Sequence, residues 1–148
     1  MGSSDSKPIN YDTGILVSED VSSFLQKTCF IIPVFGYDDD EIIRFEVKEN
    51  KVYFTESLDK IKEIHVCKHD NELTPKVQKW IVKYFPNIEE IYIFGNKITT
   101  FPRNLEDLSK LRRLWINCDK MFTDVNWAKG KFPSLERLYI KDEIRVLM

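Results

Sequence analysis

Glycine and cysteine are scarce in this 148-residue sequence, and it has neither a long apolar run nor a strong net charge. Its five glycines form no phosphate-binding pattern, which excludes the common glycine-rich nucleotide loops. The three cysteines lack paired spacing, so they favour free thiols in a cytoplasmic or other intracellular compartment over a disulfide framework. Because no run approaches ~18 apolar residues, we expect no membrane span.

Charge is nearly balanced over the whole chain but unevenly distributed along it. The formal net charge of −2 argues against broad electrostatic capture of DNA or RNA, so we expect no nucleic-acid partner. Residues 1–60 carry a net charge of −6, whereas residues 61–148 carry +4. This asymmetry could orient a charged partner, and a solvated surface explains it equally well.

Apolar residues recur at a fixed spacing in the second half of the chain. In the clearest unit, apolar residues stand at positions 1, 4, 6 and 11 and asparagine at position 9: Ile88, Ile91, Ile93, Ile98 and Asn96. Residues 101–108 then read Phe-Pro-x-x-Leu-x-x-Leu. Both segments resemble the two halves of a repeat of the leucine-rich-repeat family.

The same spacing recurs on both sides of this unit. Units begin at Ile61, 27 residues before Ile88, at Leu111, 23 residues after it, and at Leu135, 24 residues farther on. An earlier candidate at residues 42–60 is either a short repeat or a capping hairpin. The resemblance implies an α/β repeat protein of four to five units. Such a solenoid has a parallel sheet on its concave face and short helices or irregular connections on its convex side.

We expect the chain to form a single domain. Residues 1–17 are predicted to be a flexible segment and residues 18–148 to be the leucine-rich-repeat domain. Within the domain, residues 18–60 should form the N-terminal cap, residues 61–141 the repeats and residues 142–148 the C-terminal end.

Local signals predict several elements around the repeats. A capping signal favours a helix over residues 18–28, and Pro33 favours an edge position for the strand at residues 30–35. Thr74-Pro75 is typical of a helix start, with threonine as N-cap and proline in the first turn. Residues 102–110 predict a short helix or turn.

Positions 3, 5 and 7 of each unit should point away from the core, onto the face that the resemblance assigns to partner binding. The candidate residues are Glu63, Glu90, Arg113 and Arg137 at position 3, His65, Tyr92, Trp115 and Tyr139 at position 5, and Phe94, Asn117 and Lys141 at position 7. Tyrosine, tryptophan and arginine are enriched at interface hot spots. Stacking between neighbouring rings would explain the same aromatic residues by sheet stability alone.

No motif indicates catalysis or a metal site. The triplet at residues 12–14, Asp-Thr-Gly, occurs once, whereas aspartic proteases need two such carboxylates. His65, Cys67 and His69 alternate, but the repeat spacing directs them to different sides, which disfavours zinc binding. The acidic run at residues 38–41 lacks the ligand spacing of a calcium loop.

The sequence therefore predicts a non-catalytic module, without cofactor or metal, that binds another protein or a peptide. One alternative is a structural or assembly subunit that docks through its solenoid ends, for which a homo-oligomer is an option. A second alternative is an effector- or immunity-type inhibitor of another protein. The sequence does not choose the partner.

Overall fold

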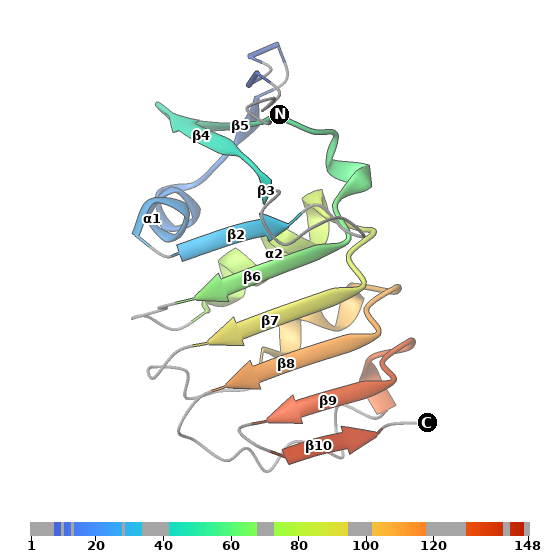
Figure 1. Ribbon diagram of the computed structural model, residues 1–148. Coiled ribbons are helices and arrows are strands. Elements are labelled where there is room, and N and C mark those ends of the chain that lie inside the picture. The colour runs from blue at the N-terminus through green and yellow to red at the C-terminus, as the bar shows by residue number, and fades with distance from the viewer. Residues whose placement is uncertain are drawn as a thin grey trace.

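The computed structural model describes residues 8–9, 11–12, 14–27, 29–33, 42–67, 73–94, 102–117, 130–140 and 143–146. This part of the chain forms a mixed α/β fold with two sheets (Figure 1). The larger sheet has seven strands: β2 (Cys29–Pro33), β3 (Ile42–Ile43), β6 (Glu63–Cys67), β7 (Glu90–Phe94), β8 (Arg113–Asn117), β9 (Arg137–Ile140) and β10 (Glu143–Val146). Their spatial order is β10-β9-β8-β7-β6-β2-β3.

The four central strands β6 to β9 run parallel and in register. Ile64 pairs with Ile91, Ile91 with Leu114, and Leu114 with Leu138. All four of these side chains are at most 1 % exposed. The residues between them on each strand face the other side, as the two-residue period of a strand requires. The parallel arrangement predicted for the units at residues 61, 88, 111 and 135 is therefore confirmed.

Each parallel strand is entered through the same tight turn. The amide at position 1 donates to the carbonyl three residues before it, at 3.1 to 3.4 Å: Ile61 to Leu58, Ile88 to Phe85, Leu111 to Leu108, and Leu135 to Phe132. The residues at position 1 are all buried, as are Phe85, Leu108 and Phe132. The repeated spacing thus extends three residues upstream of position 1.

The described helical segments include α1 (Glu19–Lys27), η1 (Leu58–Lys60), α2 (Pro75–Tyr84) and η2 (Arg103–Asp107). Of these, α2 and η2 lie against one face of the parallel strands, and α1 packs beside α2 and β2. The Thr74 hydroxyl accepts a hydrogen bond from the Val77 amide at 3.3 Å, so the predicted cap of α2 is confirmed. The predicted helix near residues 18–28 and the short helix within 102–110 are confirmed as well, as α1 and η2.

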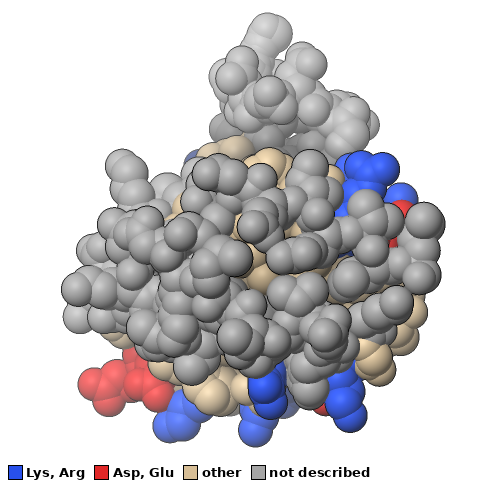
Figure 2. All heavy atoms as spheres, turned by 90° about the horizontal axis from the view of Figure 1, so that it is seen from below, with Lys and Arg blue, Asp and Glu red and all other residues tan. Residues whose placement is uncertain are grey.

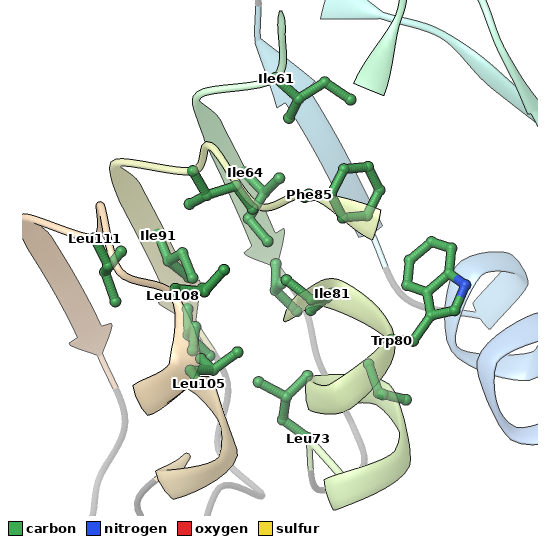
Figure 3. Close-up of a cluster of buried hydrophobic side chains, with 14 of the residues drawn as sticks. Ile61, Ile64, Leu73, Trp80, Ile81, Phe85, Ile91, Leu105, Leu108 and Leu111 are labelled. Atoms are coloured by element: carbon green, nitrogen blue, oxygen red, sulfur yellow. The ribbon is translucent and has the colours of Figure 1, made fainter. Parts of the chain in front are cut away.

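The core lies between the parallel strands and these helices. In Figure 3, Ile64 and Ile91 project from the sheet toward Ile81 of α2 and Leu105 of η2. Ile81 and Leu105 are 1 % and 0 % exposed, so helix and sheet exclude water between them. This packing fixes the outward direction of the intervening residues on each strand.

One buried polar side chain links α2 to η2. Gln78 on α2 is 4 % exposed, and its Nε2 donates to the Leu73 carbonyl at 2.6 Å. Its Oε1 accepts from the Asn104 amide of η2 at 2.8 Å. Because both ends of the amide are paired, its burial carries no uncompensated polar group.

The candidate repeat at residues 42–60 does not join the parallel strands. Instead, β4 (Phe45–Lys48) and β5 (Lys51–Phe54) form an antiparallel hairpin, and β1 (Ile15–Leu16) pairs with β5 to complete the three-stranded sheet. Glu49 has φ of 60° in the two-residue turn. The hairpin alternative is thus confirmed. The sequence left both alternatives open because alternating apolar residues fit an antiparallel hairpin as well as a repeat strand.

The prediction that the strand containing Pro33 lies at a sheet edge was wrong. β2 pairs with β6 through residues 29–31 and with β3 through Ile32 and Pro33. Pro33 is the last residue of the strand, where a missing amide interrupts little of the ladder. At the other end of the sheet, β10 pairs antiparallel with β9 and forms the edge.

Some predicted positions lie outside the described residues. They include Asn96 and His69 at position 9 of their units, Lys141 and the acidic run at residues 38–41. In the part of the chain that is described, no helix has the length and apolar character needed to cross a membrane.

Candidate protein interface

The outward face of the parallel strands carries a continuous row of rings. We call His65, Tyr92, Trp115 and Tyr139 the aromatic row. Ring centroids are 4.6 Å apart between His65 and Tyr92, 5.9 Å between Tyr92 and Trp115, and 4.4 Å between Trp115 and Tyr139. The last pair is stacked at 15°. All four residues are partly buried, so each ring keeps some surface open to solvent.

Position 3 carries a column of charges beside these rings. We call Glu63, Glu90, Arg113 and Arg137 the segregated column, because two acidic residues precede two basic ones. Strand register makes Glu63 a direct neighbour of Glu90, and Arg113 a direct neighbour of Arg137. Neighbouring parallel strands are about 4.8 Å apart, so like charges face one another within each half.

The acidic half of this column is held by the rings of its own strands. His65 Nε2 lies 2.6 Å from Glu63 Oε2, and the Tyr92 hydroxyl donates to Glu90 Oε1 at 2.7 Å. An ionised carboxylate accepts from about four directions, so both carboxylates keep further acceptor capacity. Burial, together with the hydrogen bond to Glu90, raises the pKa of Tyr92 above its ordinary value of 10, and the phenol stays a neutral donor at physiological pH.

The basic half is less well paired. Arg113 Nη1 lies 3.9 Å from Glu90 Oε1, and the Arg113 side chain is 40 % exposed. Arg137 is exposed and makes no ion pair with any side chain that the structure describes. Two neighbouring guanidinium groups with so little compensation make this end of the sheet electropositive.

Figure 2 views the molecule from the end at which β10 lies. Among the described atoms, blue Lys and Arg side chains recur along the lower margin, with an acidic group at the lower left. Residues 61–148 carry a net charge of +4.

A second column of charges, at position 2, was missed by sequence reasoning. We call Lys62, Glu89, Arg112 and Glu136 the alternating column. Lys62 and Arg112 both pair with Glu89, at 3.6 Å and 3.5 Å, and Arg112 Nε donates to Glu136 at 3.0 Å. Hydrogen bonds to Glu136 and Glu89 raise the pKa of Arg112. The sequence did contain a signal for this column: the residue directly after position 1 alternates between basic and acidic from unit to unit.

Backbone hydrogen bonds run along the same column. The Lys62 carbonyl accepts from the Glu89 and Glu90 amides at 2.7 Å and 3.1 Å. The Glu89 carbonyl accepts in the same way from the next unit, at 2.8 Å and 3.1 Å, and so does the Arg112 carbonyl. Charge pairing and backbone pairing therefore tie each unit to the next at this point.

Two buried nitrogen atoms on the outward face lack partners. Trp115 Nε1 and Arg113 Nε are covered, yet neither has a hydrogen-bond partner in the described structure. A buried donor without a partner costs about 1–3 kcal/mol, so maximal stability alone would not select these two groups.

The remaining predicted interface residues are placed only in part. Phe94 ends β7 at position 7 and is partly buried, and its register partner is Asn117. The structure does not describe the side chain of Asn117, and Lys141 is outside the described residues. The eight residues at positions 3 and 5 are the ones that the four strands bring together.

Metal-ligand clusters and cavities were sought among the residues that the structure describes. They contain no group of three or more His, Cys, Asp or Glu side chains placed to hold a metal ion. A cavity of about 420 Å³ lies beside β5 and is lined by Gly14, Ile15, Phe54 and the segment 55–58. Its one carboxylate, Glu56, pairs with Lys60 at 3.5 Å. An active site needs several convergent titratable groups.

Comparisons with known proteins identify no relative. No protein family, curated protein or solved structure matches the chain significantly.

Proposed function

We propose that this chain is a leucine-rich-repeat solenoid and that it acts as a non-catalytic module, binding another protein through the aromatic row. The proposal combines the sequence resemblance with the geometry of the outward sheet face. Function belongs to the site more than to the fold, so the surface carries the argument.

The regular geometry of the units supports the solenoid. Units that begin at Ile61, Ile88, Leu111 and Leu135 share a tight turn, a parallel strand in register and a buried position-1 residue. Each unit alone leaves its apolar face open, and stacking on the next unit covers it. The antiparallel strands β2 and β10, one on each side of the parallel strands, cover the first and last of them, as end caps do.

The single observation that carries the proposed function is the partly exposed aromatic row on four successive strands. Tyrosine and tryptophan offer large contact areas at little rotamer cost, which makes them effective interface anchors. Ring stacking alone would equally stabilise the sheet. Trp115 Nε1 and Arg113 Nε on this face and Trp80 Nε1 on α2 are all buried without partners in the described structure, so these nitrogens do not separate the two explanations.

A second candidate is an assembly subunit that docks through the end of its sheet. The edge position of β10 favours it, because an edge strand presents unpaired backbone groups to another chain. An inhibitor of another protein is a special case of the first proposal and differs in the identity of the partner. The three cysteines lack paired spacing in the sequence, which favours an intracellular site of action.

The test is affinity capture of partners from an extract of source cells, followed by measurement of each affinity with purified partner. Wild type is compared with the Tyr92→Ala/Trp115→Ala variant, and both are first shown to be folded by circular dichroism and thermal melting. Loss of hot-spot anchors should weaken binding by about 2 kcal/mol or more, roughly thirtyfold.

A matched control removes an aromatic side chain from the convex side. Tyr84→Ala deletes a partly buried ring on α2 and should leave the affinity unchanged. Equal recovery of a partner by wild type and by the Tyr92→Ala/Trp115→Ala variant would reject the aromatic row as the interface. If the double variant does not fold, Arg137→Glu tests the same face without removing a ring.

A further inference from the structure

The two charge columns stand one residue apart on the same strands, yet they order their charges differently. The alternating column runs basic, acidic, basic, acidic, and its neighbours form ion pairs. The segregated column runs acidic, acidic, basic, basic, and only Glu90 and Arg113 at its centre approach each other, at 3.9 Å. Both columns contain two acidic and two basic residues, so composition does not explain the difference.

The segregated order is unfavourable for the isolated protein. Like charges on directly neighbouring strands destabilise a sheet, and each half of this column contains one such pair. The same two acidic and two basic residues could have been placed with alternating signs, as they are in the alternating column. A charged partner that spans the column would neutralise both halves, because its own charges would meet opposite ones.

We propose, on the basis of the function above, that the occupant of this face is an extended protein segment with a basic residue and an acidic residue four positions apart and an apolar residue midway. The acidic side chain meets Arg137, the outer residue of the basic half, and Arg113 approaches it from the inner side. The basic side chain meets Glu63, the outer residue of the acidic half, and Glu90 approaches it from the inner side. The apolar residue between them rests on Tyr92 and Trp115.

The spacing follows from strand geometry. Glu63 and Arg137 are separated by three strand intervals, which is about 14 Å at 4.8 Å per interval. An extended chain advances about 3.3 Å per residue, so positions i and i+4 are about 13 Å apart. Those positions and the middle residue i+2 point to the same side of the segment, which allows all three to face the sheet at once.

The chemistry of each contact is specific. A guanidinium presents parallel N–H donors that match a carboxylate, and two neighbouring arginines can hold one carboxylate from two sides. Glu63 and Glu90 each accept one hydrogen bond from their own strand and can accept more from a lysine or arginine. A segment with two like charges would meet repulsion at one half of the column.

The experiment is a selection of random twelve-residue peptides, displayed on phage, against the folded full-length chain. We expect the recovered sequences to be enriched in a basic and an acidic residue four apart around an apolar one, in either chain direction. A recovered peptide is then synthesised, and its affinity is measured by calorimetry against wild type and two charge-swap variants.

The two swaps keep net charge and composition constant. Glu90→Arg/Arg113→Glu makes the segregated column alternate, and we expect it to weaken the peptide about tenfold or more. Glu89→Arg/Arg112→Glu makes the alternating column segregated, and we expect it to lower the Tm while changing the affinity less than about twofold. If the first swap does not fold, Arg113→Gln/Arg137→Gln replaces it, and a Glu→Gln change in the peptide should then have no further effect.

The outcomes separate this inference from the proposed function. Peptides that need Tyr92 and Trp115 but ignore the Glu90→Arg/Arg113→Glu swap would overturn the charge order and leave the aromatic interface standing. Peptides that bind the Tyr92→Ala/Trp115→Ala variant as tightly as wild type would overturn the aromatic interface. If the selection recovers no peptide while a captured protein still requires the aromatic row, the proposal of an extended segment is overturned and the aromatic interface is kept.

Discussion

The alternating and segregated columns lie on the same four strands and differ in the order of their charges. Arg112 and Arg113 are consecutive residues, yet Arg112 bridges two carboxylates whereas Arg113 reaches one, at 3.9 Å. The backbone is equally regular along both columns, since the same hydrogen-bonded ladder repeats from unit to unit. The fold therefore determines the positions of the charged residues, whereas the sequence determines the order of their signs.

Under the proposed function, the comparison separates two roles within a single unit: contact with the next unit at position 2 and contact with a partner at position 3. Position 2 joins each unit to the next through ion pairs and backbone hydrogen bonds. Position 3 leaves like charges side by side next to a partly exposed row of rings. Charges that already form ion pairs within their column have little capacity to pair with a partner. Like charges on neighbouring strands would instead be stabilised by a partner of opposite charge.

The largest expected effect is on the free energy of unfolding and comes from a core substitution beneath both columns. Leu114 is fully buried beneath Arg113 and Trp115, in register between Ile91 and Leu138. Leu114→Ala should lower the free energy of unfolding by about 2–5 kcal/mol, because it leaves a cavity in close-packed surroundings. Urea denaturation measures the change. The volume-conserving Leu114→Ile is the control and should cost less than about 1.5 kcal/mol. A loss below about 1 kcal/mol for the alanine variant would contradict the described core.

Much of this core could be predicted from the sequence. Positions 1, 4 and 6 of the units at residues 61, 88, 111 and 135 are buried as the spacing predicts. The hairpin at residues 42–60 could not be told from a repeat, because Phe45, Val47 and Val52 fit both spacings and pairing partners are not local. The same limit explains β2, whose second neighbour is the two-residue strand β3.

A smaller effect sharpens the contrast between the two neighbouring arginines. Arg112→Ala removes the shared partner of Glu89 and Glu136, so it should lower the Tm by a few degrees. Arg113→Ala removes one half of a like-charged pair with Arg137, so it should leave the Tm unchanged or slightly raised. Thermal melting at low ionic strength measures both, and ~1 M NaCl should reduce the difference because salt screens exposed charges.

The opposite ranking would contradict the division of roles between the columns. Arg113→Lys serves as a second control, because it keeps the charge and removes the forked donors. If Arg113→Ala lowers the Tm as much as Arg112→Ala does, the segregated column contributes to stability like its neighbour.

The candidate site was predictable in outline but not in its pairing. The outward direction of positions 3 and 5 follows from the two-residue period, so the aromatic row and the segregated column could be named in advance. Which charges pair depends on side-chain direction and on the register between strands. The bond from Tyr92 to Glu90, two residues away on the same strand, was therefore visible only in the structure.

The smallest expected effect tests that bond and appears only in alkaline solution. Burial and the Glu90 carboxylate raise the pKa of Tyr92 above 10, so the folded chain holds this proton more tightly than the unfolded chain. The stabilisation is complete below pH 10 and is lost as pH rises above it. The unfolding free energy of wild type relative to Tyr92→Phe should thus fall as the pH rises from 10 to about 12, by less than about 1 kcal/mol because the phenol is partly exposed. Glu90→Gln should reduce this slope without abolishing it, since burial remains the larger cause. A difference between wild type and Tyr92→Phe that is constant with pH would contradict the raised pKa of Tyr92. An unchanged slope in the Glu90→Gln variant would mean that Glu90 does not hold the phenol, and the acidic half would then lack its support from the aromatic row.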